Sequence, residues 1–377
     1  MKKSIKLTIL LLMATTLLLQ PGCAKEPEAV TSESNRWPEL LRVLPENEYS
    51  LKGAFLQDEG YKQLYSQDKD ETLFLKIMPM LVLSTPYSEA EWQETLGFTR
   101  ADITQTILAQ ADDNRLQYYQ AVRGQFSQEE VENAAKTGPL NEHLETMTYR
   151  GVEFYGWGED DDIHMDWRSG VRKIGRGHRL AYIGDFACWV IWTDEVKEMI
   201  DSYKGKVKSL ADNEDYRLLA EVLEEMGTVT AFFSAESQSI THVMEIHKEE
   251  LDELRDEGQE QFIKEIENEP LLKPYQALAA GAGMDENGTY LIIALANPSE
   301  AATKENVGLL EQRINESKVF WKSGGDRKWM DSIESFDIKS QGRLTVAKLY
   351  GVVFTNWADF EVSRGLRRSY RPLLMHE

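Results

Sequence analysis

Tight-turn sequences between apolar stretches constrain the fold of this chain more than any other feature. The stretch MDENGTYLIIAL carries Asn287-Gly288 at a turn, and FDIKSQGRLTVAKL turns at Gln341-Gly342. Turns of this kind join neighbouring antiparallel strands into hairpins. We therefore expect antiparallel pairing in the second half of the chain.

From Trp37 onward, predicted strands and helices do not alternate strictly. This order favours antiparallel or mixed sheets with packed helices over a doubly wound parallel sheet, and the predicted class is α+β. The predicted strands span residues 49–56, 116–124, 147–156, 181–192, 228–234, 275–283, 289–296, 335–339 and 344–350.

Helices are predicted from caps and apolar spacing. Asp212 or Asn213 is placed to cap a helix through EDYRLLAEVLEEM. A second helix is expected to begin at Ser239 and run to about Asn268, with a polar face dense in Glu and Asp. Such a face is more typical of solvent exposure than of a binding site.

A duplicated module is suggested by two similar segments. YQAV at 119–122 and YQAL at 275–278 lie in similar strand-like settings, and each is followed by a predicted helix. Each is also preceded by a helical region and an earlier strand, GAFL at Gly53 and TAFF at Thr230. A repeated strand-helix order fits these matches, although four similar residues also arise by coincidence.

The amino-terminal segment has the pattern of a secretory leader. A short basic start is followed by an apolar run at 7–19 that is interrupted only by threonines. This run is shorter than the ~20 apolar residues that a bilayer-spanning helix needs. The run ends near Gly22-Cys23, and a polar stretch with Pro27 follows it.

Here the chain resembles bacterial lipoprotein precursors, in which the cysteine after such a leader becomes the lipidated amino terminus. Gln20 and Pro21 stand where that pattern usually has leucine and a small residue. An uncleaved signal anchor and ordinary signal cleavage are the alternatives. The resemblance implies a signal peptide at 1–22, and a lipidated Cys23 with diacylglyceryl and palmitate-type chains at the head of a tether over 23–36. Two α+β modules are predicted to follow, at 37–226 and 227–377.

Cysteine count and charge exclude several kinds of site and partner. The second cysteine, Cys188, lies in the apolar stretch IGDFACWVIW and is predicted to be a core residue of a buried strand. With Cys23 lipidated, no disulfide is expected, and the count of two cysteines by itself excludes a cysteine-based metal site. The net charge of −22 disfavours nucleic acid as a partner.

A second resemblance rests on longer segments. YRGVEFYGWGEDDDIHMDW precedes a long apolar strand ending in IW. TDEVKEMIDSYKGKVKSLADNEDYRLLAEVLEEM follows that strand, and the second half opens with TAFF. This order resembles an uncharacterised family of secreted or lipid-anchored bacterial proteins, a domain of unknown function. The resemblance covers about residues 40–351, implies a fold and a location, and brings no catalytic residues.

Two groups of candidate site residues stand out. In GEDDDIHMD, the carboxylates of Asp160, Asp162 and Asp166 are close enough in sequence for a calcium site, although Met165 stands where an EF-hand needs glycine, and a solvated acidic turn is the alternative. Tryptophans beside turns and a basic cluster form the second group, a candidate ligand site. Its members are Trp157, Trp167, Trp321, Trp329, Arg172 and Arg176. The alternatives are a structural role for the tryptophans and pairing of the arginines with the protein's own acidic surface.

No motif specifies a reaction. G-x-S-x-G and H-E-x-x-H are both missing from the sequence, and no cofactor is predicted. The function predicted is that of a lipoprotein anchored to the bacterial cell membrane on its extracytoplasmic side. Its role would be non-catalytic, either binding or envelope organisation, with the lipid bilayer as its anchor and an envelope protein or small ligand as partner. The alternative is an envelope hydrolase that uses the acidic-loop carboxylates.

Overall fold

The computed structural model describes residues 36–60, 89–110, 118–160, 162–168, 175, 177–242, 270–317, 328–351 and 372–377. Trp37–Glu377 forms one compact unit. No helix in these ranges is long and apolar enough to cross a membrane.

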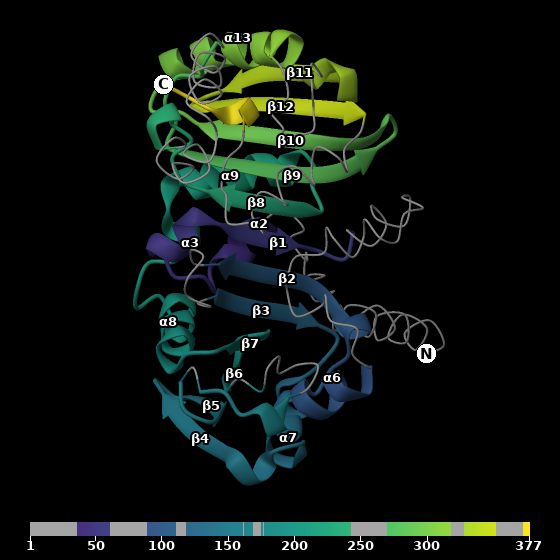
Figure 1. Ribbon diagram of the computed structural model, residues 1–377, viewed down its shortest axis with the longest axis vertical. Coiled ribbons are helices and arrows are strands. Elements are labelled where there is room, and N and C mark those ends of the chain that lie inside the picture. Colours follow the sequence, from purple (N-terminus) through teal and green to yellow (C-terminus); the bar gives the residue numbers. More distant parts are fainter. Residues whose placement is uncertain are drawn as a thin grey trace, which may run out of the picture. The chain divides into compact units, whose positions relative to one another are not determined.

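One antiparallel sheet of 12 strands runs through this unit, in the order β11-β12-β10-β9-β8-β1-β2-β3-β7-β6-β5-β4 (Figure 1). The predicted α+β class is confirmed. The strands are β1 (Ala54–Gln57), β2 (Ile103–Gln110), β3 (Tyr118–Gly124), β4 (Leu144–Tyr149), β5 (Val152–Trp157), β6 (His178–Ile183), β7 (Phe186–Val190), β8 (Thr230–Ser234), β9 (Ala277–Asp285), β10 (Gly288–Ala296), β11 (Ile333–Gln341) and β12 (Leu344–Gly351).

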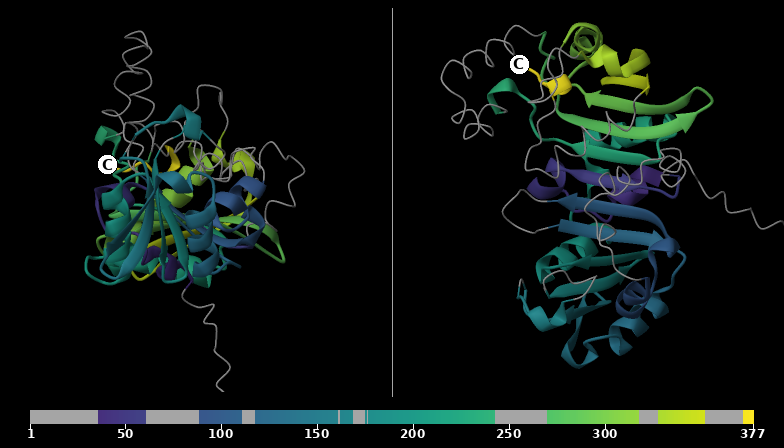
Figure 2. Two further views of the ribbon diagram at one scale, coloured as in Figure 1. Left: turned by 90° about the horizontal axis from the view of Figure 1, so that it is seen from below. Right: turned by 45° about the vertical axis from the view of Figure 1, so that its right-hand side comes forward.

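Helices cover both faces of the sheet, which Figure 2 shows from two further directions. On one face, α6, α7 and α13 contribute to an apolar core with Phe55 and Phe232. On the other face, α2, α3, α8 and α9 pack over a second core. The helices are α2 (Arg36–Leu41), α3 (Glu48–Lys52), α6 (Glu89–Leu96), α7 (Gln128–Thr137), α8 (Thr193–Tyr203), α9 (Glu214–Glu225) and α13 (Glu300–Glu316), with short 3₁₀ turns η3 (Arg100–Asp102), η4 (Asn141–His143), η5 (Met165–Trp167), η7 (Leu210–Asp212), η8 (Trp329–Ser332) and η9 (Pro372–Leu374).

The sheet consists of two halves that repeat one strand order outward from its centre. From β1 the order is β2, β3, β7, β6, and from β8 it is β9, β10, β12, β11. The central strands β1 and β8 pair antiparallel, with Phe55 opposite Phe232 and Ala54 opposite Phe233. GAFL and TAFF are therefore equivalent strands that meet at a local twofold axis.

The two halves also have matching turns and helix caps. The hairpins β6–β7 and β11–β12 each turn through a glycine with positive φ, Gly184 at 66° and Gly342 at 58°. Helix α7 follows β3 with Ser127 as its N-cap, and α13 follows β10 with Ser299 as its N-cap. The first half adds a hairpin, β4–β5, beyond β6.

The predicted sequence register of the repeat was wrong. YQAV lies on β3, third from the centre of its half, whereas YQAL leads into β9, second from the centre. The topological equivalent of β3 is β10. The similar segments YQAV and YQAL therefore do not occupy equivalent positions in the two halves, because the pairing of the strands determines which strands are equivalent.

Three predicted strands were also wrong in part. Residues 49–52 belong to α3, because the Asn47 side chain accepts hydrogen bonds from the amides of Tyr49 and Ser50 and so begins a helix. The predicted strand 147–156 is divided by a turn at Arg150 and Gly151, both with positive φ. The predicted strand 181–192 is divided at Gly184, and strand β2 was not predicted.

Other predictions are confirmed. Asn213 caps α9, and its side chain accepts hydrogen bonds from the amides of Asp215 and Tyr216. Every residue of β7 is buried, and Cys188 is a free core cysteine. Both predicted hairpins form, β9–β10 and β11–β12. The predicted helix from Ser239 falls almost wholly outside the described residues.

Residues near the carboxyl terminus belong to the core of the second half. Leu373, Leu374 and Met375 are buried, and the amide of Leu272 donates to the carbonyl of Met375 at 3.1 Å. Arg313, fully buried on α13, donates from Nε to the carbonyl of Leu373 at 2.9 Å. This segment therefore holds α13 against the sheet.

The shared centre of the sheet leads to a stability prediction. Replacing Phe55 or Phe232 with Ala removes a ring that is 1% or 4% exposed, and each change is expected to lower the free energy of unfolding by about 3–5 kcal/mol. Because β1 and β8 are paired, each variant is expected to unfold in a single transition. Urea denaturation followed by far-UV circular dichroism measures this, with Val207→Ala, 42% exposed, as the control. Two separate transitions would contradict it.

Candidate functional site

The acidic loop after β5 contains the predicted calcium ligands, and Asp160 lies against a buried cation. Asp160 Oδ1 accepts from the Arg179 guanidinium at 2.7 Å, and the Arg179 side chain is only 5% exposed. The same oxygen accepts from the amide and hydroxyl of Thr193, at 3.0 and 2.8 Å. Asp160 therefore neutralises a buried charge of β6 and joins the loop to the start of α8.

The other two carboxylates have different surroundings. Asp162 Oδ2 lies 2.7 Å from His164 Nε2, and Asp166 is exposed on η5. Among the described residues, no three His, Cys, Asp or Glu side chains form a group that could hold a metal ion. The three predicted ligands thus lie in three separate settings.

Aromatic stacking organises the loop. Trp167 stacks with His164 at 3.8 Å and with His143 at 4.7 Å between ring centroids. Trp157 stacks with His178 at 4.5 Å. Half of the six histidines of the chain are therefore gathered with two tryptophans at one end of β5 and β6.

The tryptophans predicted as ligand platforms differ in access. Trp157 and Trp329 are core residues, 1% and 6% exposed, so their rings are not open to a ligand. Trp167 is half-buried, so of the described tryptophans in this group it is the one that a ligand could reach. Trp321, Arg172 and Arg176 lie outside the described residues. Proximity to glycines and charged turns did not distinguish core from surface rings.

An exposed apolar pair lies beside the stacked rings and was not predicted. Ile163 is 46% exposed and Met165 is 60% exposed, both higher than Val207 or Met284, the other exposed large hydrophobic residues described. We refer to Ile163 and Met165 as the 163/165 pair. Contiguous exposed apolar patches rimmed by polar groups are typical of contact surfaces, whereas single exposed apolar side chains are common on any protein. In the sequence, Ile163 and Met165 are surrounded by acidic residues, so this segment was interpreted only as a group of carboxylates.

A buried carboxyl group lies at the start of α8. Glu195 Oε2 accepts from the amide of Trp192 at 3.2 Å, while Oε1 is buried without a hydrogen-bond partner. Burial, with a smaller contribution from the charges of Glu198 and Asp160, raises the pKa of Glu195 to about 8. The carboxyl group is therefore protonated in the folded protein at neutral pH.

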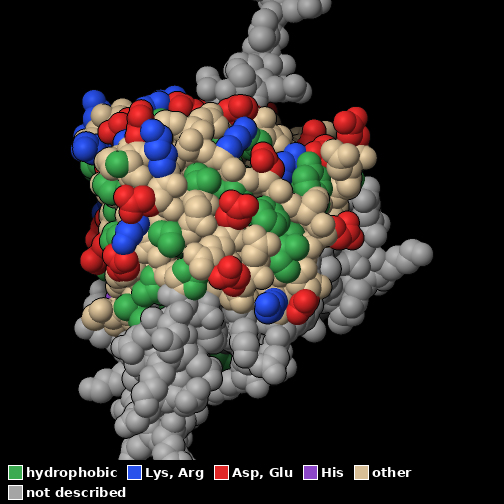
Figure 3. All heavy atoms as spheres, turned by 90° about the horizontal axis from the view of Figure 1, so that it is seen from above, with side chains coloured by type: hydrophobic (Ala, Val, Ile, Leu, Met, Phe, Trp, Pro, Cys, Tyr) green, Lys and Arg blue, Asp and Glu red, His purple; other side chains and the backbone are tan. Residues whose placement is uncertain are grey.

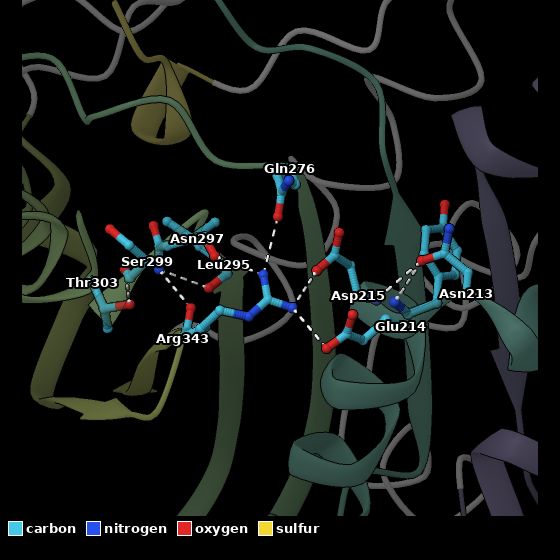
Figure 4. Close-up of polar contacts among 10 residues, drawn as sticks. Asn213, Glu214, Asp215, Gln276, Leu295, Asn297, Ser299, Thr303 and Arg343 are labelled. Atoms are coloured by element: carbon cyan, nitrogen blue, oxygen red, sulfur yellow. Dashed lines mark hydrogen bonds and ion pairs between the residues drawn. The ribbon is translucent and has the colours of Figure 1, made fainter. Parts of the chain in front are cut away.

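The second half of the chain holds a polar network centred on Arg343, in the β11–β12 turn (Figure 4). One guanidinium nitrogen donates to Gln276 Oε1 at 3.1 Å and to the carbonyl of Asn297 at 3.0 Å. The other lies 3.1 Å from Asp215 and 3.4 Å from Glu214, at the start of α9. Arg343 thus connects the turn to β9, β10 and the first turn of a helix.

Behind Arg343 the network is buried and its amides are paired. The Asn297 amide nitrogen donates to the carbonyl of Leu295 and to Thr345 Oγ1, each at 3.0 Å, and Asn297 Oδ1 accepts from Asn306 at 2.7 Å. A fully bonded buried network fixes one arrangement of its elements. We therefore assign the Arg343 network to structure rather than to ligand binding.

No protein family and no curated protein matches the chain. Among solved structures, the chain is similar to TP0453 in crystal form III, with a TM-score of 0.39 and 12% identity over 86% of this chain and 97% of that one. Crystal form I of TP0453 gives a TM-score of 0.36 and 9% identity, over 84% and 94%.

Glu195 generates a pH prediction. Its ordinary pKa of 4.5 is raised to about 8 on folding, so the unfolded chain loses this proton between these values while the folded chain retains it. The free energy of unfolding therefore falls as pH rises through this window. The glutamine in Glu195→Gln cannot ionise, so the free energy of unfolding of this variant should not fall in this way. Between pH 4.5 and pH 8, the stability of the variant relative to the wild type should therefore rise by about 2–4 kcal/mol.

Urea denaturation at pH 4.5, 6 and 8 measures this difference. The control is Asp194→Asn on the same helical turn, where the side chain is 88% exposed. A wild-type pH dependence that persists in Glu195→Gln would contradict the assignment.

Proposed function

We propose that this chain is a lipoprotein anchored to the bacterial cell membrane on its extracytoplasmic side, with a non-catalytic binding role. The leader that ends at Gly22-Cys23 carries the proposal. A basic start, a short apolar run and a polar stretch after the cysteine fit a lipid attached at Cys23. Two or more acyl chains there would give stable anchoring, since each buried methylene contributes about 0.8 kcal/mol.

The properties of the other cysteine support Cys23 as the residue that is modified. Cys188 is fully buried on β7, and burial raises the pKa of its thiol far above the ordinary value. A buried thiol with a raised pKa is a poor nucleophile. Lipid attached through a cysteine would therefore be expected at Cys23.

A binding role is supported by the 163/165 pair. These side chains project from a loop that the Asp160–Arg179 and Asp160–Thr193 contacts attach to β6 and α8. A tethered loop loses less conformational freedom on binding than a free one. We propose the 163/165 pair and the neighbouring Trp167 as the contact surface for an envelope partner.

The hydrolase alternative gains no support from Asp160, because its Oδ1 already accepts from a buried guanidinium. No specific observation favours it.

The anchor is tested by Cys23→Ala. In cells labelled with radioactive palmitate, the wild type is expected to carry label and to sediment with membranes, whereas Cys23→Ala should carry none. Cys188→Ala, which changes the buried cysteine, should behave as the wild type. Mass spectrometry of the amino-terminal peptide identifies the modification, and an unmodified Cys23 in membrane-purified protein would overturn the anchor.

The contact surface is tested by the double variant Ile163→Ser, Met165→Ser. Envelope proteins that are cross-linked to the wild type in cells are expected to be lost from the double variant, because the apolar contact area is removed. Val207→Ser, which replaces an apolar residue 42% exposed, is the matched control and should retain them. Equal cross-linking in all three proteins would rule out the 163/165 pair as the contact.

A further inference from the structure

Strand β11 is the last strand of the described sheet on this side, whereas the first half continues beyond its equivalent strand. In the first half, β6 is the equivalent of β11, and it pairs on its outer side with β5. Leu180 of β6 lies opposite Tyr155 of β5 and is fully buried. Within the described part of the chain, no strand occupies the corresponding position beside β11.

Equivalent residues follow from the two glycine turns. Ile183 and Phe186 flank the Gly184 turn, as Gln341 and Leu344 flank the Gly342 turn. Counting back from the turns makes Ile338 the equivalent of Leu180. Ile338 packs against the same apolar core as Leu180 but is only partly buried, and so is Phe336.

The backbone of β11 has groups directed outward at the same positions. In a two-residue hairpin, the residues that flank the turn form a hydrogen-bonded pair, and bonded pairs then alternate along the strands. Gln341, Lys339 and Asp337 therefore bond to β12. Phe336, Ile338 and Ser340 direct their amide and carbonyl groups away from the sheet, as Leu180 does toward β5.

The edge of β11 is complementary to itself. In an antiparallel pair centred on Ile338, each Ile338 lies opposite its copy, and Asp337 lies opposite Lys339 of the other copy, twice by symmetry. The Asp337–Lys339 pairs fall at non-hydrogen-bonded positions, where side chains approach most closely. Both side chains are exposed.

The described surroundings of the edge are helix α13 and a surface of mixed charge. Helix α13 packs on the apolar face of the sheet, where Leu310 and Ile314 share a core with Ala347 and Leu349 of β12. From the end that bears α13 and β11, Figure 3 shows acidic, basic and apolar side chains interspersed over the described part of this face.

We propose that two copies of this chain associate through their β11 strands, antiparallel about a twofold axis at Ile338. Phe336, Ile338 and Ser340 of each copy bond to the other copy, and two Asp337–Lys339 pairs set the register. An exposed edge strand is usually protected by an inhibitory charge. Here the acidic residue two positions before the lysine makes the edge attractive to a second copy. This proposal is independent of the anchor and of the 163/165 pair.

Charge reversal tests both the partner and the register. Asp337→Lys places two lysines opposite each other at each pair, and Lys339→Asp places two acids there. Each single variant is expected to weaken dimerisation of the detergent-purified full chain about tenfold or more, measured by analytical ultracentrifugation. The double variant Asp337→Lys, Lys339→Asp restores the pairs and should dimerise as the wild type does. An equimolar mixture of the two single variants should form mixed dimers.

The opposite edge of the sheet supplies the control. Glu145→Lys on β4, the other terminal strand, should leave dimerisation unchanged. A monomeric wild type would overturn the proposal, as would a dimer that both single variants leave intact. A dimer that the double variant fails to restore would also overturn it, because that result would indicate a different partner strand or register. Circular dichroism and urea unfolding establish that each variant is folded.

A cross-link gives a second measurement. Hydrogen-bonded antiparallel residues have Cα atoms about 5.5 Å apart, within the range that a disulfide requires. Ile338→Cys in a Cys23→Ala background should therefore form a disulfide-linked dimer on mild oxidation, since Cys188 is buried. Thr148→Cys in the same Cys23→Ala background, on the exposed side of β4, should form no disulfide-linked dimer under the same conditions. Equal cross-linking at both positions would contradict a specific β11 interface.

Discussion

The pairing of β1 with β8 is the interaction on which the rest of this structure depends. These strands are only 4 and 5 residues long, yet they join the two halves of a 12-stranded sheet. Their residues are buried on both faces, and the Phe55–Phe232 pair lies at the point of local twofold symmetry. The two halves therefore share one sheet and two continuous cores, and neither half could bury its inner strand alone.

The parts of the fold that the sequence predicted are those determined by local chemistry. Turn glycines, the Asn213 cap and the apolar run around Cys188 each act over a few residues, and each prediction is confirmed. The failures have specific causes. Arg150 adopts a positive φ without being a glycine, and the Asn47 cap competes with a strand-like sequence. Of the two matches that suggested the repeat, GAFL and TAFF lie on equivalent strands, whereas YQAV and YQAL do not, because equivalence of strands depends on long-range pairing.

The candidate site was harder to predict, since access to solvent is a property of the assembled chain. Trp157 and Trp167 both lie near glycines, yet one belongs to the core and the other lies at the surface between two histidines. The carboxylates of the acidic loop were recognised as a group, but the buried guanidinium that binds Asp160 comes from a strand 19 residues later. The 163/165 pair became visible only once the chain was folded.

The buried segment near the carboxyl terminus has a consequence for the timing of folding. Leu373 and Met375 accept hydrogen bonds from Arg313 and Leu272, so the second half of the sheet lacks part of its support until these residues have been synthesised. Completion of the first half also depends on the second half, because β1 pairs with β8. Folding during synthesis is therefore delayed in both halves.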